Sequence, residues 1–216
     1  MEHVNKRVVD MLSDARRSFD LATSALLSGV DPASVSEELW ATDARINASE
    51  QELRRELIVH VSVSGAEDIG DVLGYTLLIK KVERIGDQAK NVWDLADEGV
   101  SLAGAPDVGE FLAVHQQVSA MFGEVAALFS DSDPDPERLA AFKSKAHDLR
   151  IAEEAQIRAL MHTTETGSYA VPRAILHRYL KRIIANLAGI LTSVTEPIDE
   201  SDTPPSPGDD TDDRED

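Results

Sequence analysis

The most informative stretch of this sequence runs from Leu78 to Val92, LIKKVERIGDQAKNV. Its apolar residues recur three and four positions apart, as they do on a helix with one buried face. Glu83, Asp87 and Asn91 are spaced by four and therefore lie along one side of that helix. Two carboxylates one turn apart repel each other unless a cation or a proton lies between them. The segment therefore predicts a long helix with an oxygen-rich face that favours a cation.

A second row of oxygen-bearing side chains precedes it, with Asp43, Asn47 and Glu50 again along one helical face. If the two helices pack as antiparallel neighbours, the rows can face one another. Hard cations, iron and manganese favour such oxygen ligands. Carboxylates at this spacing are also common on solvated helices, so the pattern alone leaves both readings open. Gly86 favours the site, because a glycine inside a helix usually has a packing reason, such as close approach of another helix.

Outward from these rows the same helical spacing continues, and no sustained alternation of strand type occurs. The chain is predicted to be all-α. Glycine and proline at the breaks divide it into six expected helices. The expected ranges are 3–28, 33–63, 66–98, 107–130, 135–163 and 171–195.

The longest internal connection, 99–106, predicts a division into two three-helix bundles in tandem. The first repeat covers 1–99 and the second 100–195. Residues 196–216 hold four prolines and ten acidic residues against Arg214, which predicts a disordered acidic tail. This tail carries −9 of the formal net charge of −19.

Composition excludes several function classes. A net charge of −19 disfavours nucleic-acid binding, and the absence of cysteine removes disulfides and thiolate metal sites. No apolar run approaches the roughly 20 residues needed to cross a bilayer, and no secretory signal begins the sequence. We expect a cytoplasmic protein without direct membrane insertion.

The motif Val82-Glu83-Arg84-Ile85-Gly86-Asp87, followed by Ala89-Lys90-Asn91-Val92, resembles the signature of the PhoU family. That family is built from two three-helix repeats with spectrin-repeat-like packing, and its E/D-x-x-x-D motif supplies ligands to iron or zinc on the bundle surface. The resemblance implies that Glu83 and Asp87 are metal ligands. The upstream pattern Asp43-x-x-x-Asn47-x-x-Glu50 also resembles the family's second helix, and these three residues are expected to support the site.

The second half departs from that pattern. Aligning the sixth expected helix with the third sets Lys181 against Glu83 and Ala185 against Asp87, so both carboxylates are lost. A lysine would repel a cation, and we therefore expect one metal site at most, holding iron, zinc or manganese. Glu153 and Glu154 are expected to be exposed and structural.

The resemblance implies a regulator of phosphate uptake and phosphate-responsive signalling, acting by contact with a phosphate transporter component or a sensor histidine kinase. A homodimer is left open. The histidines lack the spacing of di-iron or zinc-protease motifs, and no nucleotide-binding loop or paired nucleophile occurs, so no enzyme activity is expected. Two alternatives stay open: a metal-free helical adaptor, and a metal-dependent phosphate-ester hydrolase.

Overall fold

The computed structural model describes residues 2–64 and 68–195, and this part of the chain is all-α, as predicted. Its six helices lie close to the expected ranges. They are α1 (Glu2–Ser28), α2 (Pro32–Ser64), α3 (Ile69–Asp97), α4 (Val108–Ser130), α5 (Pro136–Met161) and α6 (Gly167–Thr195). The predicted acidic tail, 196–216, lies outside the described residues.

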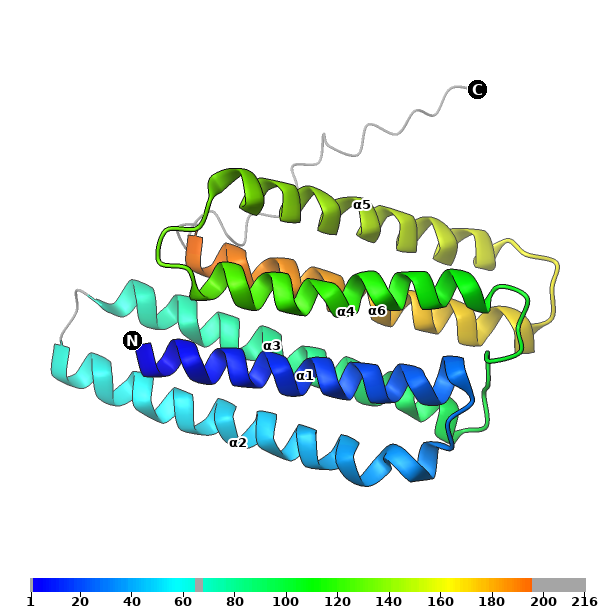
Figure 1. The fold of residues 1–216 in the computed structure, drawn as a ribbon, viewed down its shortest axis with the longest axis horizontal. Helices are drawn as coiled ribbons and strands as arrows, with labels where there is room; N and C mark the ends of the chain where they lie inside the picture. Colours follow the sequence, from blue (N-terminus) through cyan, green and yellow to red (C-terminus); the bar gives the residue numbers. More distant parts are fainter. Residues whose placement is uncertain (1, 65–67, 196–216) are drawn as a thin grey trace.

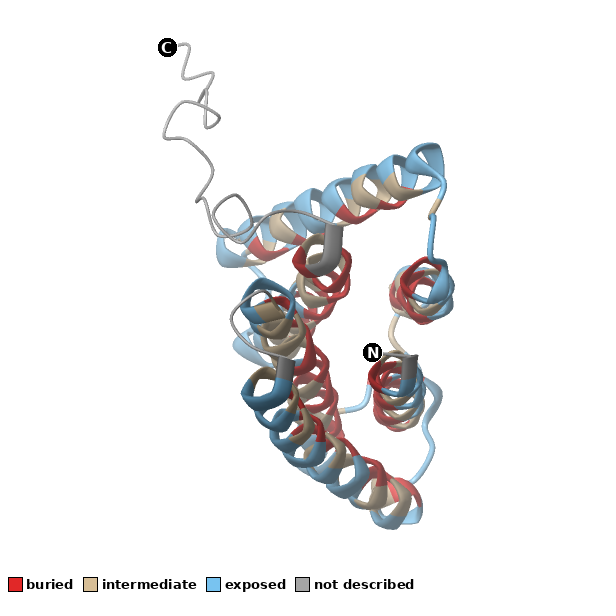
Figure 2. Ribbon diagram, turned by 90° about the vertical axis from the view of Figure 1, so that its left-hand side faces the viewer, coloured by how far each residue is buried: buried red, intermediate tan, exposed pale blue. Residues whose placement is uncertain are grey.

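The helices run lengthwise through an elongated body, with α2 at one edge and α5 at the other (Figure 1). Between them, α1 and α4 lie on one side and α3 and α6 on the opposite side (Figure 2). The helix pairs α1–α3, α3–α6, α4–α6 and α1–α4 are all in contact, so four helices form the centre. Helix α2 packs on α1 and α3, and α5 packs on α6. The two sequence halves therefore meet along α3–α6 and α1–α4.

One hydrophobic core runs through both halves. Phe19 of α1 is fully buried and its ring stacks on Phe122 of α4, with centroids 6.0 Å apart. On the other side of the body, Gly74 allows α3 to approach α6, because a Cβ at this position would lie 2.8 Å from the backbone oxygen of Ser193. The two predicted repeats therefore share one packed interior surface.

The helix ends follow the local chemistry of the sequence. Gly29 and Gly99 have φ of 70° and 87°, the left-handed conformation that glycine adopts after a helix without strain. Helix α6 begins four residues before the predicted position 171, and Pro172 lies inside it. A proline near the start of a helix removes only one backbone hydrogen bond, here the one that the carbonyl of Ser168 would accept, so the helix continues through it.

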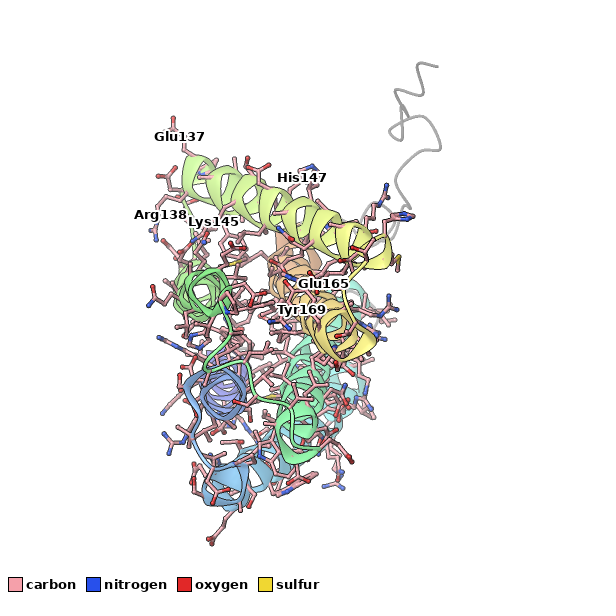
Figure 3. All side chains as sticks on the ribbon, turned by 90° about the vertical axis from the view of Figure 1, so that its right-hand side faces the viewer. Glu137, Arg138, Lys145, His147, Glu165 and Tyr169 are labelled. Atoms are coloured by element: carbon pink, nitrogen blue, oxygen red, sulfur yellow. The ribbon has the colours of Figure 1, made fainter. Side chains whose placement is uncertain are left out.

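The fifth helix departs from the arrangement of its counterpart α2. It crosses over α6 at an oblique angle and stands away from α4 (Figures 2 and 3). A side-chain bridge still joins α5 to α4, since Nζ of Lys145 donates to Oε1 of Glu124 at 2.7 Å. The second half is therefore more open than the first. Residues of α5 and α6 line two cavities, one of which also borders α4.

Candidate functional site

The two oxygen rows predicted from the sequence lie on neighbouring helices, with Asp43, Asn47 and Glu50 on α2 and Glu83 and Asp87 on α3. Gly86 brings these helices together: a Cβ at this position would lie 3.2 Å from Cδ1 of Ile46. The close approach proposed for Gly86 from the sequence is therefore confirmed. With Gly86 at the contact, the two rows face each other across a narrow seam.

Lysine 90 joins the rows at one end. Its Nζ lies 2.8 Å from Oδ1 of Asp43 and 3.0 Å from Oδ1 of Asp87, so one ammonium group bridges carboxylates from both helices. Asn47 completes this end by donating from Nδ2 to Oδ2 of Asp43 at 3.1 Å. The cation that two facing carboxylates favour is thus supplied here by the chain itself.

The other end of the rows is built from Glu50 and Glu83, and it is buried more deeply. Glu50 is 8% exposed. Nζ of Lys80 lies 2.6 Å from Oε2 of Glu83 and 3.8 Å from Oε1 of Glu50, and Arg54 reaches the same Oε1 at 2.9 Å. Although these ion-pair distances are short, Oε1 of Glu50 and Oε2 of Glu83 accept no well-oriented hydrogen bond. Two buried carboxylate oxygens at this end therefore lack the directed partners that burial normally requires.

The surroundings of Lys90 strengthen its bridge. Burial opposes the charged form, but the hydrogen bonds to Asp43 and Asp87 outweigh it, so the pKa of Lys90 lies above its ordinary value. The indole ring of Trp40 also lies 5.8 Å from Nζ, within cation–π distance. Trp93 packs edge-on against Trp40 and is held by a hydrogen bond from Nε1 to the carbonyl of Pro32. Trp93 is thus a buried packing residue, and the half-exposed Trp40 contacts both Trp93 and the bridging lysine.

The two ends of the oxygen rows differ in how well they suit a metal ion. Carboxylate and amide oxygens suit hard cations, and the two buried oxygens of Glu50 and Glu83 without hydrogen bonds are the atoms that a metal ion would satisfy. At the Asp43–Asp87 end, Lys90 already fills that role. Within residues 2–64 and 68–195, no three His, Asp or Glu side chains converge as a ready metal centre. A metal at the buried end would therefore have to displace Lys80 from Glu83 and Arg54 from Glu50.

The second-half positions aligned with Glu83 and Asp87 carry no carboxylate. Lys181, aligned with Glu83, donates from Nζ to Oε2 of Glu154 at 2.5 Å. Ala185, aligned with Asp87, lines a cavity between α3 and α6 together with Asp87 itself. No carboxylate pair of the first-repeat kind is present at these two positions.

The expectation that Glu153 is exposed was wrong. Its side chain is 2% exposed, and Oε2 lies 2.8 Å from Nδ1 of His177, whose ring packs on Phe111 at a centroid distance of 4.8 Å. Next to this pair, Nε and Nη2 of Arg173 bind both carboxylate oxygens of Asp107 at 2.6 and 2.8 Å. These groups border a cavity of about 280 Å³ between α4, α5 and α6. The sequence carried no signal for this site, because residues from three separate segments build it.

The lysines of the first site did have a signal in the sequence. Lys80 precedes Glu83 by three residues and Lys90 follows Asp87 by three, a spacing at which oppositely charged side chains meet on a helix. That spacing alone could not predict that the two lysines also contact Glu50 and Asp43 on α2.

Among the described residues, no helix is long and apolar enough to cross a membrane. No protein of curated function matches the sequence.

Comparison with protein families matches residues 8–96 to the PhoU domain, which confirms the resemblance for the segment that holds both oxygen rows. The fold is similar to that in the crystal structure of PhoU from Pseudomonas aeruginosa, with a TM-score of 0.74 and 20% sequence identity. This similarity covers 89% of the present chain and 94% of the other, so it extends to the second half.

Proposed function

We propose, from the premise that residues 8–96 form a PhoU domain within a PhoU-like fold, that this chain is a regulator of phosphate uptake and phosphate-responsive signalling. The observation that carries the proposal is the family match itself, because it covers α1–α3 and the complete pair of oxygen rows. The regulator acts in the cytoplasm by contact with a phosphate transporter component or a sensor histidine kinase.

Exposed apolar side chains support action by protein contact. Ile58, Val59 and Val63 near the end of α2 are 66%, 62% and 82% exposed. Ile69 and Leu73, at the start of α3, are 44% and 49% exposed. Apolar side chains gathered at one place on a surface commonly mark sites where proteins associate.

The metal-assisted form of this function assigns the ion to the buried end of the rows. Glu50 and Glu83 would hold it, with Asp87 from the more exposed side and with Asp43 and Asn47 in support. A bound iron, zinc or manganese ion would hold α2 and α3 at a fixed distance and offer an open coordination position to a phosphate oxygen. The oxygens of Glu50 and Glu83 without hydrogen bonds support this assignment.

The metal-free adaptor is a second candidate, and it is favoured by Lys80 and Lys90. These lysines already neutralise the carboxylates that a metal would bind. In that case the seam between α2 and α3 is a structural contact, and regulation depends on the protein surface alone.

Metal analysis of the chain purified without chelator separates these two forms. The metal-assisted form predicts bound iron, zinc or manganese near one equivalent, lost in Glu83→Gln/Asp87→Asn. The adaptor predicts no such metal in either protein. Assaying the same two samples for hydrolysis of a generic phosphate ester tests the enzyme alternative, since only a hydrolase would show turnover that disappears in the variant.

The regulatory role is tested in cells. Deletion of the gene is expected to change phosphate uptake or the expression of phosphate-responsive genes when phosphate is abundant, and the intact gene is expected to restore both. Unchanged uptake and expression in the deletion strain would contradict the role.

A further inference from the structure

A basic cavity lies between α5 and α6, on the second half of this acidic protein. Its volume is about 380 Å³, within the usual size range of small-molecule sites. Its charged and titratable lining residues are His147, Arg150, Glu154, Arg158 and Lys181. Ile151 and Ala155 add an apolar wall. In Figure 3, His147 is seen on the side of α5 that is turned away from α4.

The position of this cavity in the fold matches that of the oxygen rows in the first half. On α5, Glu154 pairs with Arg158 one turn later, as Glu50 pairs with Arg54 on α2. Both pairs have the same direction and the same spacing of four residues. Each glutamate also faces a lysine on the last helix of its own half, Lys181 for Glu154 and Lys80 for Glu50.

When α5 is aligned with α2 through these Glu–Arg pairs, and α6 with α3 as in the sequence comparison, each residue of the oxygen rows has a counterpart in the second half. Asp43 corresponds to His147, Asn47 to Ile151, Glu50 to Glu154, Glu83 to Lys181 and Asp87 to Ala185. Of the four carboxylates in the first half, one is kept. The place that favours a cation in the first half is therefore lined by basic side chains in the second.

The charge of the cavity is positive although the chain carries −19. Arg150, Arg158 and Lys181 oppose the single carboxylate of Glu154, which gives +2 with His147 neutral. The hydrogen bond from Lys181 holds the pKa of Glu154 below its ordinary value, so this carboxylate stays ionised at neutral pH and the balance is not altered by its titration. A positive cavity in a negative protein attracts small anions locally.

Lys181 and Arg158 use few of their N–H donors on Glu154. Its carboxylate takes one N–H from Lys181 and a long, weak contact of 3.4 Å from Nε of Arg158. A guanidinium has five N–H donors and an ammonium three. Within the described part of the chain, Arg150 forms no ion pair with any acidic residue. Donors are thus available for an oxyanion, and arginine suits phosphate because its planar group binds two oxygens at once.

We propose that this cavity binds the phosphate group of a small anionic ligand, held by Arg150, Arg158 and Lys181. The inference deepens the proposed function and rests on it for the choice of phosphate among oxyanions. The cavity exceeds the needs of a lone phosphate ion and has an apolar wall, so two sources of the group are tested, inorganic phosphate and a nucleoside monophosphate.

Binding of both probes to the full chain is measured by isothermal titration calorimetry in low-salt buffer at neutral pH. We expect the wild type to bind at least one probe, and Arg150→Gln/Lys181→Gln to bind it about tenfold more weakly or worse. The matched control is Arg54→Gln/Lys80→Gln, which removes the same two charge types around the first-half glutamate and is expected to bind like the wild type. Circular dichroism verifies that each variant keeps its helix content.

Three results would overturn the proposal. The wild type could bind neither probe, the control variant could lose affinity as much as the cavity variant, or Arg84→Gln/Arg182→Gln could abolish binding. The last result would place the anion in the cavity between α3 and α6, which these two arginines line. A failure here leaves the regulatory role standing if the deletion strain still shows altered phosphate uptake, and the two proposals are therefore tested separately.

Discussion

Nζ of Lys90 on α3 lies 2.8 Å from Oδ1 of Asp43 on α2, and this contact joins the two oxygen rows. The same ammonium group lies 3.0 Å from Asp87 of its own helix. An internal cation thus holds two carboxylates that would otherwise repel each other across the helix contact. We therefore expect this group to contribute to the stability of the first half.

Replacing Lys90 with methionine keeps most of its apolar stem and removes its charge. Asp43 and Asp87 would then face each other without a cation, and we expect the free energy of unfolding to fall by about 1–3 kcal/mol. Urea denaturation followed by circular dichroism measures the change. Lys6→Met, at an exposed position of α1, is the control and should change stability by less than about 0.5 kcal/mol. Equal stability of the two variants would show that the bridge contributes nothing.

The effect of a Gly86→Ala substitution on stability is expected to depend on Ile46. In an open helical position, glycine to alanine stabilises by about 1 kcal/mol, and Gly123→Ala on α4, with nothing within 4 Å, should show this gain. In Gly86→Ala the gain is opposed by the contact with Cδ1 of Ile46. A double-mutant cycle with Ile46→Val, which lacks that atom, should make the alanine more favourable by about 1 kcal/mol than it is in the wild type. Additive effects would mean that the helices adjust freely.

Glu153 and His177 form a buried pair, and replacing only one of the two residues is expected to lower stability strongly. His177→Phe keeps an aromatic ring against Phe111 but leaves the Glu153 carboxylate without its partner, so stability should drop by about 3–5 kcal/mol. Adding Glu153→Leu should recover most of the loss, because the charge is then gone as well. Glu154→Gln, at the neighbouring half-buried carboxylate, which pairs with Lys181 at the surface, is the control with an effect of less than about 1 kcal/mol. No recovery in the double variant would contradict this account.

Asp107 is expected to account for part of the stability that the protein loses at acidic pH. Hydrogen bonds from Arg173 hold the pKa of its carboxyl below its ordinary value. A depressed pKa contributes stability that is complete above the ordinary aspartate value, about 3.9, and is lost as the pH falls through the lower folded value. Thermal melts between pH 5 and about pH 2 should therefore show a smaller loss in Asp107→Asn than in the wild type. Asp148→Asn, at an exposed position, should leave the acid slope unchanged, and a wild-type slope in Asp107→Asn would refute the assignment.

The helices and the facing of the two oxygen rows could be predicted from the sequence because both depend on local spacing. Apolar periodicity defined α1–α6 to within a few residues, and Gly86 indicated the close contact that the structure shows with Ile46. The early start of α6 was missed because the effect of Pro172 depends on how near it lies to the helix start.

The side-chain partners could not be predicted in the same way. Lys90 reaches Asp43 across 47 positions of sequence, and Glu153 is buried only because α4 and α6 bring Phe111 and His177 to it. The same limit applies to the basic cavity, whose lysine and arginines lie on two helices. The surroundings of Glu153 and the basic cavity depend on how α5 packs, and Lys90–Asp43 depends on how α2 packs on α3; local spacing encodes neither.

The most direct test of the proposed regulatory role is affinity capture of the tagged full chain from its own cells, grown with abundant and with scarce phosphate and cross-linked before lysis. We expect this chain to capture a phosphate transporter component or a sensor histidine kinase, in amounts that differ between the two conditions. An unrelated tagged acidic protein should capture neither. Recovery of neither class of partner under either condition would contradict the proposed role.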